Sequence, residues 1–142
     1  MEPLMDWYIK DRIILYRPTG EQTISIVEQS NKRFLELLNG GTQSVHIILD
    51  ARRITKVPTN LLSLSNATSF LRHPSIGWVI TITNNSLIRF LGGILPQLGS
   101  MNRNRVVSEP ATAFAFLKEQ DPTLDWSTVN NALFTSDSLT PS

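Results

Sequence analysis

The side chains best suited to chemistry follow a strongly apolar run, Val45–Leu49. Asp50 comes directly after that run and ends a predicted strand. The basic and hydroxyl side chains of the next segment are Arg52, Arg53, Lys56 and Thr59. Clustered cations can bind an acidic partner or ligand, and the start of a helix favours a phosphate or another anion. The segment therefore predicts an anion-binding site, or a phosphorylation site at Thr59.

Each of these functional roles has a structural alternative. Thr59 can cap the helix that follows, and an N-cap hydrogen bond contributes about 1 kcal/mol. The basic side chains can be solvated loop residues, because exposed ion pairs contribute only about 0–1 kcal/mol. Asp50 has no second carboxylate and no histidine in its loop, so we expect it to accept a loop backbone hydrogen bond rather than to act in general acid–base catalysis.

Other reactive groups are missing from the sequence or isolated in it. The chain has no cysteine, which excludes thiol nucleophiles, thiolate metal sites and disulfides. His46 lies inside a predicted strand and His73 precedes a proline, whereas a metal site needs about three or four convergent donors. We therefore expect no catalytic residue, no metal and no cofactor, and an enzyme is the least favoured class.

The composition favours one ordinary globular domain. The chain has 142 residues, of which 41% are hydrophobic and 18% charged, with a net charge of +1. So small a charge argues against nucleic acid as a partner. No run reaches the ~20 apolar residues that span a bilayer, and a signal peptide is not evident, so a cytoplasmic protein is expected. A domain of residues 1–126 should be followed by a flexible tail, residues 127–142, rich in Ser, Thr and Asn.

Strand and helix patterns alternate along the chain. Apolar runs and period-two patterns predict strands at residues 7–9, 13–16, 45–49, 76–82 and 105–107. Helical spacing predicts helices at residues 24–39, 60–72, 86–98 and from 110 onward. The first two strands should form a hairpin around Asp11. The order β-β-α-β-α-β-α-β-α predicts a single α/β domain with a mixed, mostly parallel five-stranded sheet.

This architecture indicates where function should lie. In an open α/β sheet, functional residues gather in the loops at the carboxyl ends of the strands. The segment Lys56–Asn60 joins the strand Val45–Asp50 to the next helix and is such a loop.

The predicted helix at residues 86–98 is apolar around more than one face. Arg89 is its only charged residue, and Gly92 and Gly93 lie in its middle, where each costs roughly 1 kcal/mol relative to alanine. The glycines suggest close approach by another group. We expect this helix, with Ile94 and the helix at residues 60–72, to form a self-association surface or the lip of an apolar cleft; simple packing on the sheet is the alternative.

The element order, the aspartate at the end of the strand Val45–Asp50, and the loop Ala51–Asn60 together resemble the STAS family over roughly Asp6–Leu124. That family includes domains of sulfate transporters and bacterial anti-sigma-factor antagonists, and CRAL-TRIO-like lipid-binding proteins are related to it. In the antagonists this loop ends in Asp-Ser-Ser-Gly, and a partner kinase phosphorylates a serine at the helix start. The matching residues here are Pro58, Thr59, Asn60 and Leu61. The resemblance therefore implies the fold more strongly than the phosphoswitch.

Two functions are expected from these observations. The first is a non-enzymatic regulatory module that binds another protein, or a second copy of itself, through Lys56–Asn60 and the following helix. The alternative is a binding module for a small lipid or apolar metabolite, held between the helices at residues 60–72 and 86–98. The candidate binding residues are Asp50, Lys56, Pro58, Thr59, Asn60, Arg89 and Ile94.

Overall fold

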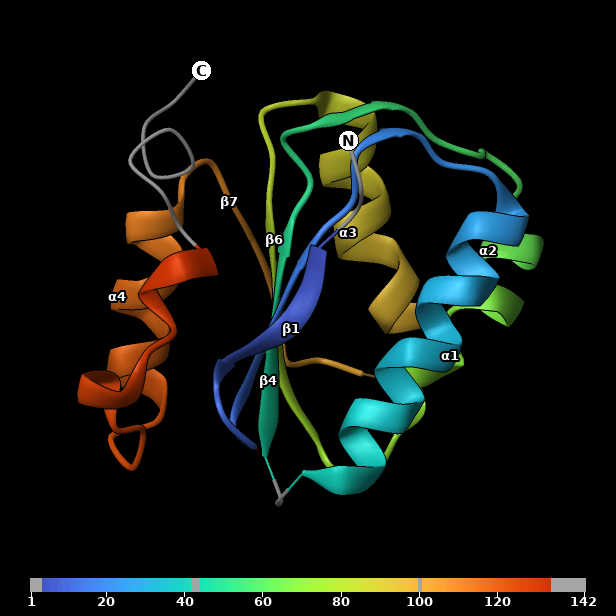
Figure 1. Cartoon of the computed structure of the whole chain (residues 1–142). Helices are drawn as coiled ribbons and strands as arrows, with labels where there is room; N and C mark the ends of the chain where they lie inside the picture. The colour runs from blue at the N-terminus through green and yellow to red at the C-terminus, as the bar shows by residue number, and fades with distance from the viewer. Residues whose placement is uncertain (1–3, 42–43, 100, 134–142) are drawn as a thin grey trace.

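The computed structural model describes residues 4–41, 44–99 and 101–133, which form a sheet covered by helices on both faces (Figure 1). The sheet has the strand order β1-β2-β4-β6-β7. Its strands are β1 (Leu4–Ile9), β2 (Ile13–Arg17), β4 (Val45–Asp50), β6 (Ile76–Ile82) and β7 (Asn104–Val107). Strand β1 is antiparallel to β2, and the other pairs are parallel. The predicted mixed five-stranded sheet is confirmed.

The hairpin between β1 and β2 is the only antiparallel pair among the described strands of this sheet. Its turn contains Asp11, which adopts a left-handed φ of 66°. Aspartate tolerates this conformation better than most residues because its short side chain can form local hydrogen bonds. The turn sets β2 as the first of the parallel strands.

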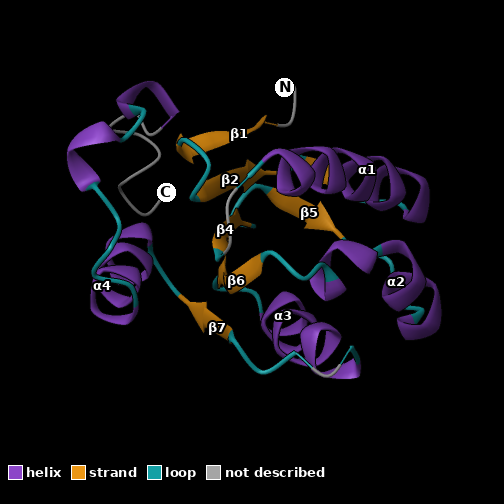
Figure 2. Cartoon of the chain, turned by 90° about the horizontal axis from the view of Figure 1, so that it is seen from below, coloured by secondary structure: helices purple, strands orange, loops and turns teal. Residues whose placement is uncertain are grey.

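The helices divide unequally between the two faces. Helices α1 (Ile24–Gly40), α2 (Leu61–Ala67) and α3 (Ser86–Leu98) cover one face, and α4 (Pro110–Gln120) covers the other (Figure 2). Each face has its own apolar core, because the central parallel strands are buried on both sides. Ile14, Ile47 and Val79 belong to the core under α1–α3, whereas Leu15, Ile48 and Ile80 belong to the core under α4.

The helix predicted at residues 60–72 is interrupted. Helix α2 ends at Ala67, and a short 3₁₀ helix, η1 (Ser69–Arg72), follows. Thr68 lies between them with φ −120° and ψ 42°, and its hydroxyl donates to the carbonyl of Leu64 at 2.8 Å. Such back-bonding of a threonine side chain disturbs regular helix geometry.

The segment after β4 contains structure that the sequence did not predict. Strand β5 (Ile54–Lys56) pairs in parallel with β3 (Gly20–Glu21) in a second, two-stranded sheet. Gly20 enters this pairing with a φ of 80°, a left-handed angle that favours glycine. The pairing fixes the segment that leads to α2.

The flexible tail was predicted to begin at residue 127, but the described residues up to 133 pack on the domain. Two short 3₁₀ helices, η2 (Trp126–Thr128) and η3 (Asn131–Leu133), lie on the α4 face (Figure 1). Leu133 is buried, and the backbone N–H of Asn130 donates to the carbonyl of Tyr8 at 2.8 Å. The rest of the predicted tail, residues 134–142, lies outside the described residues.

Candidate functional site

Asp50 ends β4 as a buried carboxylate held by two arginines. The guanidinium of Arg52 donates from Nε and Nη2, each at 2.9 Å, and the Arg52 backbone N–H donates at 3.2 Å. Arg17 Nε lies 3.4 Å from Asp50 Oδ2. Burial alone would raise the pKa of Asp50, but the hydrogen bonds and charge of Arg52, with the charge of Arg17, outweigh it and lower the pKa. The predicted backbone hydrogen bond is present, and Asp50 serves as the centre of an ion cluster.

The ion cluster is also linked to η3. Arg17 is buried, and its Nη2 donates to the carbonyl of Leu133 at 2.8 Å. Burial lowers the pKa of Arg17, although Asp50 acts in the opposite direction. The arginine therefore links β2, β4 and the C-terminal segment, and this role was not visible in the sequence.

The N-cap of α2 is Asn60 and not Thr59, so the prediction of Thr59 as N-cap is wrong. The Asn60 side chain accepts from the backbone N–H of Ser63 at 3.0 Å. The helix therefore begins at Leu61, one residue later than predicted, and asparagine is a stronger N-cap residue than threonine. Thr59 and Lys56 are exposed, and phosphorylation of Thr59 stays a prediction.

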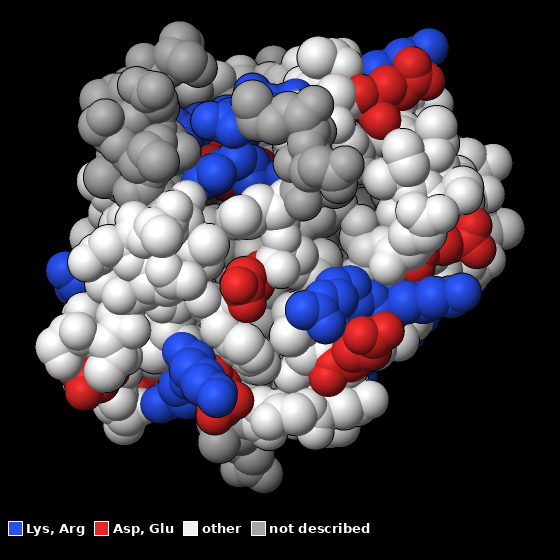
Figure 3. Space-filling model, in the orientation of Figure 1, with Lys and Arg blue, Asp and Glu red and all other residues white. Residues whose placement is uncertain are grey.

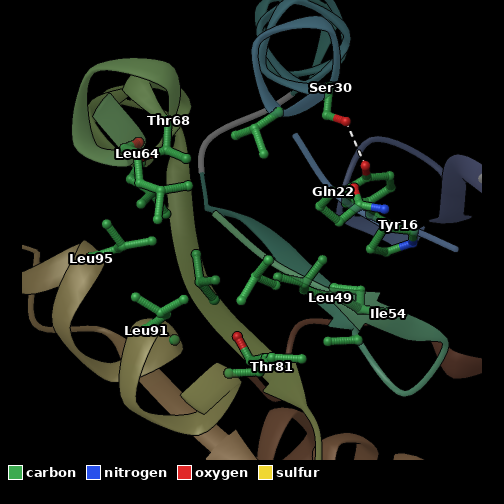
Figure 4. A pocket seen from close by; sticks show the side chains of 18 of the residues that line it. Tyr16, Gln22, Ser30, Leu49, Ile54, Leu64, Thr68, Thr81, Leu91 and Leu95 are labelled. Atoms are coloured by element: carbon green, nitrogen blue, oxygen red, sulfur yellow. Dashed lines mark hydrogen bonds between the residues drawn. The ribbon is translucent and has the colours of Figure 1, made fainter. Parts of the chain in front are cut away.

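Beside this loop lies a partly open apolar pocket of ≈ 150 Å³ between the sheet and the helices α1–α3 (Figure 4). Its floor comes from three neighbouring strands, because Tyr16 pairs with Leu49 and Leu49 pairs with Thr81. All three residues lie near the carboxyl ends of their strands, the edge where α/β sheets place ligands. The surrounding apolar residues include Phe34, Ile54, Leu64, Phe70, Leu91 and Leu95.

The pocket brings together only part of what the sequence predicted. Pro58 lines it, and the helices at residues 60–72 and 86–98 contribute side chains, as the apolar-cleft alternative required. Ile94 and Arg89 are absent from the described lining. Ile94 is half-buried on α3, while Arg89 is exposed and donates to the carbonyl of Thr83 at 3.4 Å and to Ser108 Oγ at 3.3 Å.

The pocket residues that sequence reasoning missed are those inside strands. Tyr16 and Thr81 were assigned to strands, and no residue pattern separates a strand side chain that lines a cavity from one that packs fully. A useful signal was the polar Thr81 within the apolar run Ile76–Ile82. A hydroxyl in such a run needs either a partner or a ligand.

The close approach predicted from the two glycines of α3 is confirmed for one of them. A Cβ at Gly92 would lie 3.2 Å from Thr81 Oγ1 and 3.3 Å from Thr81 Cβ, whereas a Cβ at Gly93 would have no neighbour within 4 Å. Gly92 therefore lets α3 pack closely against β6 at the pocket.

Several large apolar side chains on α2 and α3 point away from the pocket. Leu62 is 73% exposed and Phe90 is 54% exposed. The set of exposed residues near the starts of these helices is Leu61, Leu62, Leu87 and Phe90, which we call the α2–α3 apolar set. Over the face drawn in Figure 3, acidic and basic side chains are interspersed among broad uncharged areas.

The two histidines have structural partners. His46 is buried in β4, where its Nδ1 accepts from the Trp78 backbone N–H at 2.9 Å and its Nε2 lies 2.8 Å from Asp121 Oδ2. Nδ1 must therefore be unprotonated and Nε2 must donate. Burial lowers the pKa of His46, against the opposing effect of Asp121. His73 Nε2 lies 2.8 Å from Asn39 Oδ1. Among the described residues no cluster suits a metal ion.

Comparison with known proteins identifies the fold. No known family profile and no curated protein matches the chain. Among solved structures, it is similar to an uncharacterised protein of the DUF3478 family from Shewanella loihica PV-4, described as having a SpoIIAA-like fold, with a TM-score of 0.59 and 12% identity. The match covers 82% of this chain and 92% of that chain. The chain therefore has the SpoIIAA-like fold, which is STAS-like, as the sequence resemblance implied. In the described part of the chain, no helix combines the length and apolar character needed to cross a membrane.

Proposed function

We propose that this SpoIIAA-like domain is a non-catalytic binding module that holds a small apolar molecule between its sheet and the helices α1–α3. The observation that carries the proposal is the pocket of ≈ 150 Å³, whose described lining contains no charged side chain. Protein interiors are close-packed and leave few voids larger than a water molecule. A partly open apolar space of this size at the carboxyl edge of a parallel sheet is therefore best explained by a ligand.

The size of the pocket sets the size of the ligand. An apolar cavity of about 150 Å³ in a protein core can stay dry and bind benzene. The ligand, or the part of it that enters, should therefore have the dimensions of one substituted ring or a short branched chain. Because burial of apolar surface contributes roughly 25 cal/mol per Å², such a ligand can bind without any ion pair.

Toluene binding to two matched valine variants tests this proposal. Val27 is a half-buried residue of α1 that lines the pocket, and Val129 is a half-buried residue that packs on the opposite face. We expect toluene to shift the NMR signals of Leu91 and Val79 in the wild type, Val27→Phe to weaken binding at least ~10-fold by filling space, and Val129→Phe to bind normally. Absence of saturable toluene binding, or equal binding by both variants, would contradict the proposal.

A native mass spectrum of the purified protein complements this titration. A small molecule that co-purifies should add a noncovalent mass to wild type and to Val129→Phe, and much less to Val27→Phe. A covalent phosphate would be seen in the same spectrum as a separate mass increase, and fragmentation would show whether it lies on Thr59.

A second candidate function is regulatory protein binding, and the exposed α2–α3 apolar set favours it. Large apolar side chains that stay exposed on a helix can mark an interaction site. The partner would contact Lys56–Asn60 and the outer side of α2, because Lys56, Thr59 and Asn60 are exposed there. Such a partner could be a second copy of the chain.

Sedimentation velocity tests self-association directly. If the α2–α3 apolar set forms a dimer contact, Leu62→Glu and Phe90→Glu should each raise the dissociation constant at least ~10-fold, while Leu98→Glu, at the other end of α3, should have a small effect. A concentration-independent monomer would exclude the homodimer. For a separate regulatory partner, Thr59→Glu should change affinity, as expected of a phosphorylatable contact.

A further inference from the structure

The polar groups that line the pocket allow the ligand to be described more closely, and this inference rests on the proposed function. The polar side chains in the described lining are Tyr16, Gln22, Ser30, Thr68 and Thr81. All of them are uncharged residue types. What distinguishes them is whether their hydrogen-bonding groups are already used within the protein.

Tyr16 and Ser30 satisfy each other. The Ser30 hydroxyl donates to the carbonyl of Ile26 at 3.1 Å, and the Tyr16 and Ser30 hydroxyls are hydrogen-bonded to one another. Because a serine hydroxyl has one hydrogen and it goes to Ile26, Tyr16 must be the donor to Ser30. Burial raises the pKa of Tyr16, against the opposing effect of Ser30, so the phenol stays neutral at physiological pH. Figure 4 shows this pair at the side of the pocket opposite Leu91.

Gln22 and Thr68 also direct their donors into the protein. The amide nitrogen of Gln22 donates to the carbonyl of Thr19 at 3.2 Å. The hydroxyl of Thr68 donates to the carbonyl of Leu64 at 2.8 Å. Neither donor is available to a guest in the pocket without breaking an existing hydrogen bond.

Thr81 is the one of these five residues whose side chain forms no hydrogen bond within the described part of the chain. Its side chain is only 2% exposed, it lines the pocket beside Leu91, and no hydrogen bond to its hydroxyl is present among the described residues (Figure 4). The side-chain atoms of the described residues that are fully buried without a partner are Arg12 Nε and Thr19 Oγ1, so the Thr81 hydroxyl keeps some accessible surface at the pocket that its residue lines. Gly92 faces Thr81 Oγ1, and the absence of a side chain there lets the backbone of α3 lie close to this hydroxyl.

We propose that the pocket selects a neutral, compact apolar molecule with a single hydrogen-bonding oxygen, such as a phenol, an alcohol or a ketone, and that Thr81 is the residue that recognises this oxygen. The hydroxyl of Thr81 can donate to a carbonyl or accept from a ligand hydroxyl. A carboxylate is excluded as the buried group, because no cation in the described lining can pair with it and an unpaired buried charge is strongly unfavourable.

The test compares three ring compounds of similar size: toluene, phenol and benzoate. Each is titrated into the wild type, Thr81→Val, which replaces the hydroxyl by a methyl group, and Thr81→Ser, which keeps it. Because phenol and toluene differ in hydration, the informative quantity is the ratio of their dissociation constants in each protein, compared between proteins as a double-mutant cycle. Wild-type-like NMR spectra without ligand verify that the variants are folded.

We expect the preference for phenol over toluene to fall about 2- to 10-fold in Thr81→Val, the range that one net hydrogen bond gives, and to be retained in Thr81→Ser. Benzoate at pH 7 should bind at least ~100-fold more weakly than phenol to every protein. Toluene binding with an unchanged phenol preference in Thr81→Val would overturn the role of Thr81 while leaving the proposed function standing. Benzoate binding as tight as that of phenol would overturn the neutral ligand class. Failure of all three compounds to bind the wild type would overturn the proposed function and this inference together.

Discussion

The hydroxyl of Thr81 should make the ligand-free protein less stable than it could be. It lines the apolar pocket and has no hydrogen-bond partner among the described residues, and a polar group left unsatisfied at such a site costs up to about 1–3 kcal/mol. We therefore predict that Thr81→Val raises the free energy of unfolding by about 1 kcal/mol, as measured by urea denaturation. Thr83→Val is the control, because the Thr83 hydroxyl accepts from the Asn85 backbone N–H at 3.0 Å and its loss should destabilise. A destabilised Thr81→Val would show that the hydroxyl is satisfied in solution.

Removal of the charge at Asp50 should strongly destabilise the domain. The carboxylate is 1% exposed and faces Arg17, which is 7% exposed, so neither charge can be hydrated when the other is lost. Breaking a buried ion pair by removing one partner costs about 3–5 kcal/mol. We predict a loss of this size for Asp50→Asn in urea denaturation. The matched change Asp125→Asn, at an exposed residue that caps η2, should cost no more than a loss of one cap, about 1 kcal/mol.

Acid should destabilise the protein in two successive steps. The lowered pKa of His46 means that the folded state resists its protonation, because Nδ1 already accepts from Trp78. The stability that neutral His46 contributes is therefore complete above the ordinary histidine pKa of about 6.5. It is lost as the pH falls through the lower pKa of His46 in the folded state. Although burial raises the pKa of Asp121, hydrogen bonds from Thr123 and His46 and the charge of Arg12 hold it at about 2. The stability that Asp121 contributes is present above the ordinary aspartate pKa of 3.8 and is lost as the pH falls toward 2.

An NMR titration of the His46 ring should show a midpoint below 6.5. Urea denaturation between pH 7.5 and about pH 2 should show stability decreasing with acidity in both steps. A His46 midpoint at or above the ordinary value would contradict the first step.

Within the helix α3, alanine substitutions at the two adjacent glycines should have different effects on stability. Gly93 has open space at its Cβ position, so Gly93→Ala should stabilise the helix by up to about 1 kcal/mol. At Gly92 the new Cβ would press on Thr81 at 3.2–3.4 Å, so this gain should be cancelled and α3 should move off β6. Thermal unfolding would measure the stability change of each variant, and toluene titration would measure the effect of a displaced α3 on the pocket. Equal stabilisation by both substitutions would show that α3 is not packed closely against β6 at the pocket.

The elements also show what could be predicted from the sequence. The strands Val45–Asp50 and Ile76–Ile82 were found because a strand buried on both faces is a continuous apolar run. Strands β3 and β5 were missed because they contain so few residues that no period can be recognised. The pairing that defines them joins segments far apart in the sequence. The break at Thr68 depends on a side-chain hydrogen bond that propensity does not reveal.

The candidate site was predicted only in its location. The carboxyl edge of the sheet and the two helices beside it followed from topology. The pocket itself depends on how Tyr16, Leu49 and Thr81 align across three strands, and this register is set by the whole sheet. Asp50 was recognised, but its arginine partner Arg17 came from another strand and was not.

For the whole molecule, the segment after α4 should be an integral part of the domain. Leu133 is 8% exposed and belongs to the core under α4, and truncating such a leucine costs about 2–5 kcal/mol. We predict a loss in this range for Leu133→Ala in urea denaturation. Leu62→Ala, at a leucine that is 73% exposed, should change stability by no more than about 0.5 kcal/mol. If Leu133→Ala and Leu62→Ala both changed the free energy of unfolding only slightly, the segment after α4 would not contribute to the stability of the fold.

The hydrogen bond between Asn130 and Tyr8 has a consequence for solubility. Strands β1 and β7 are the two edges of the sheet, and an uncovered edge can pair with the edge of another molecule and start aggregation or strand exchange. Strand β7 is short and carries the charged residue Arg105, which disfavours pairing with another edge strand. Strand β1 is longer, and part of its open side is occupied by the backbone at Asn130. Detachment of that segment would therefore convert the first strand of the protein into a template for polymerisation, even while the pocket on the opposite face stayed intact.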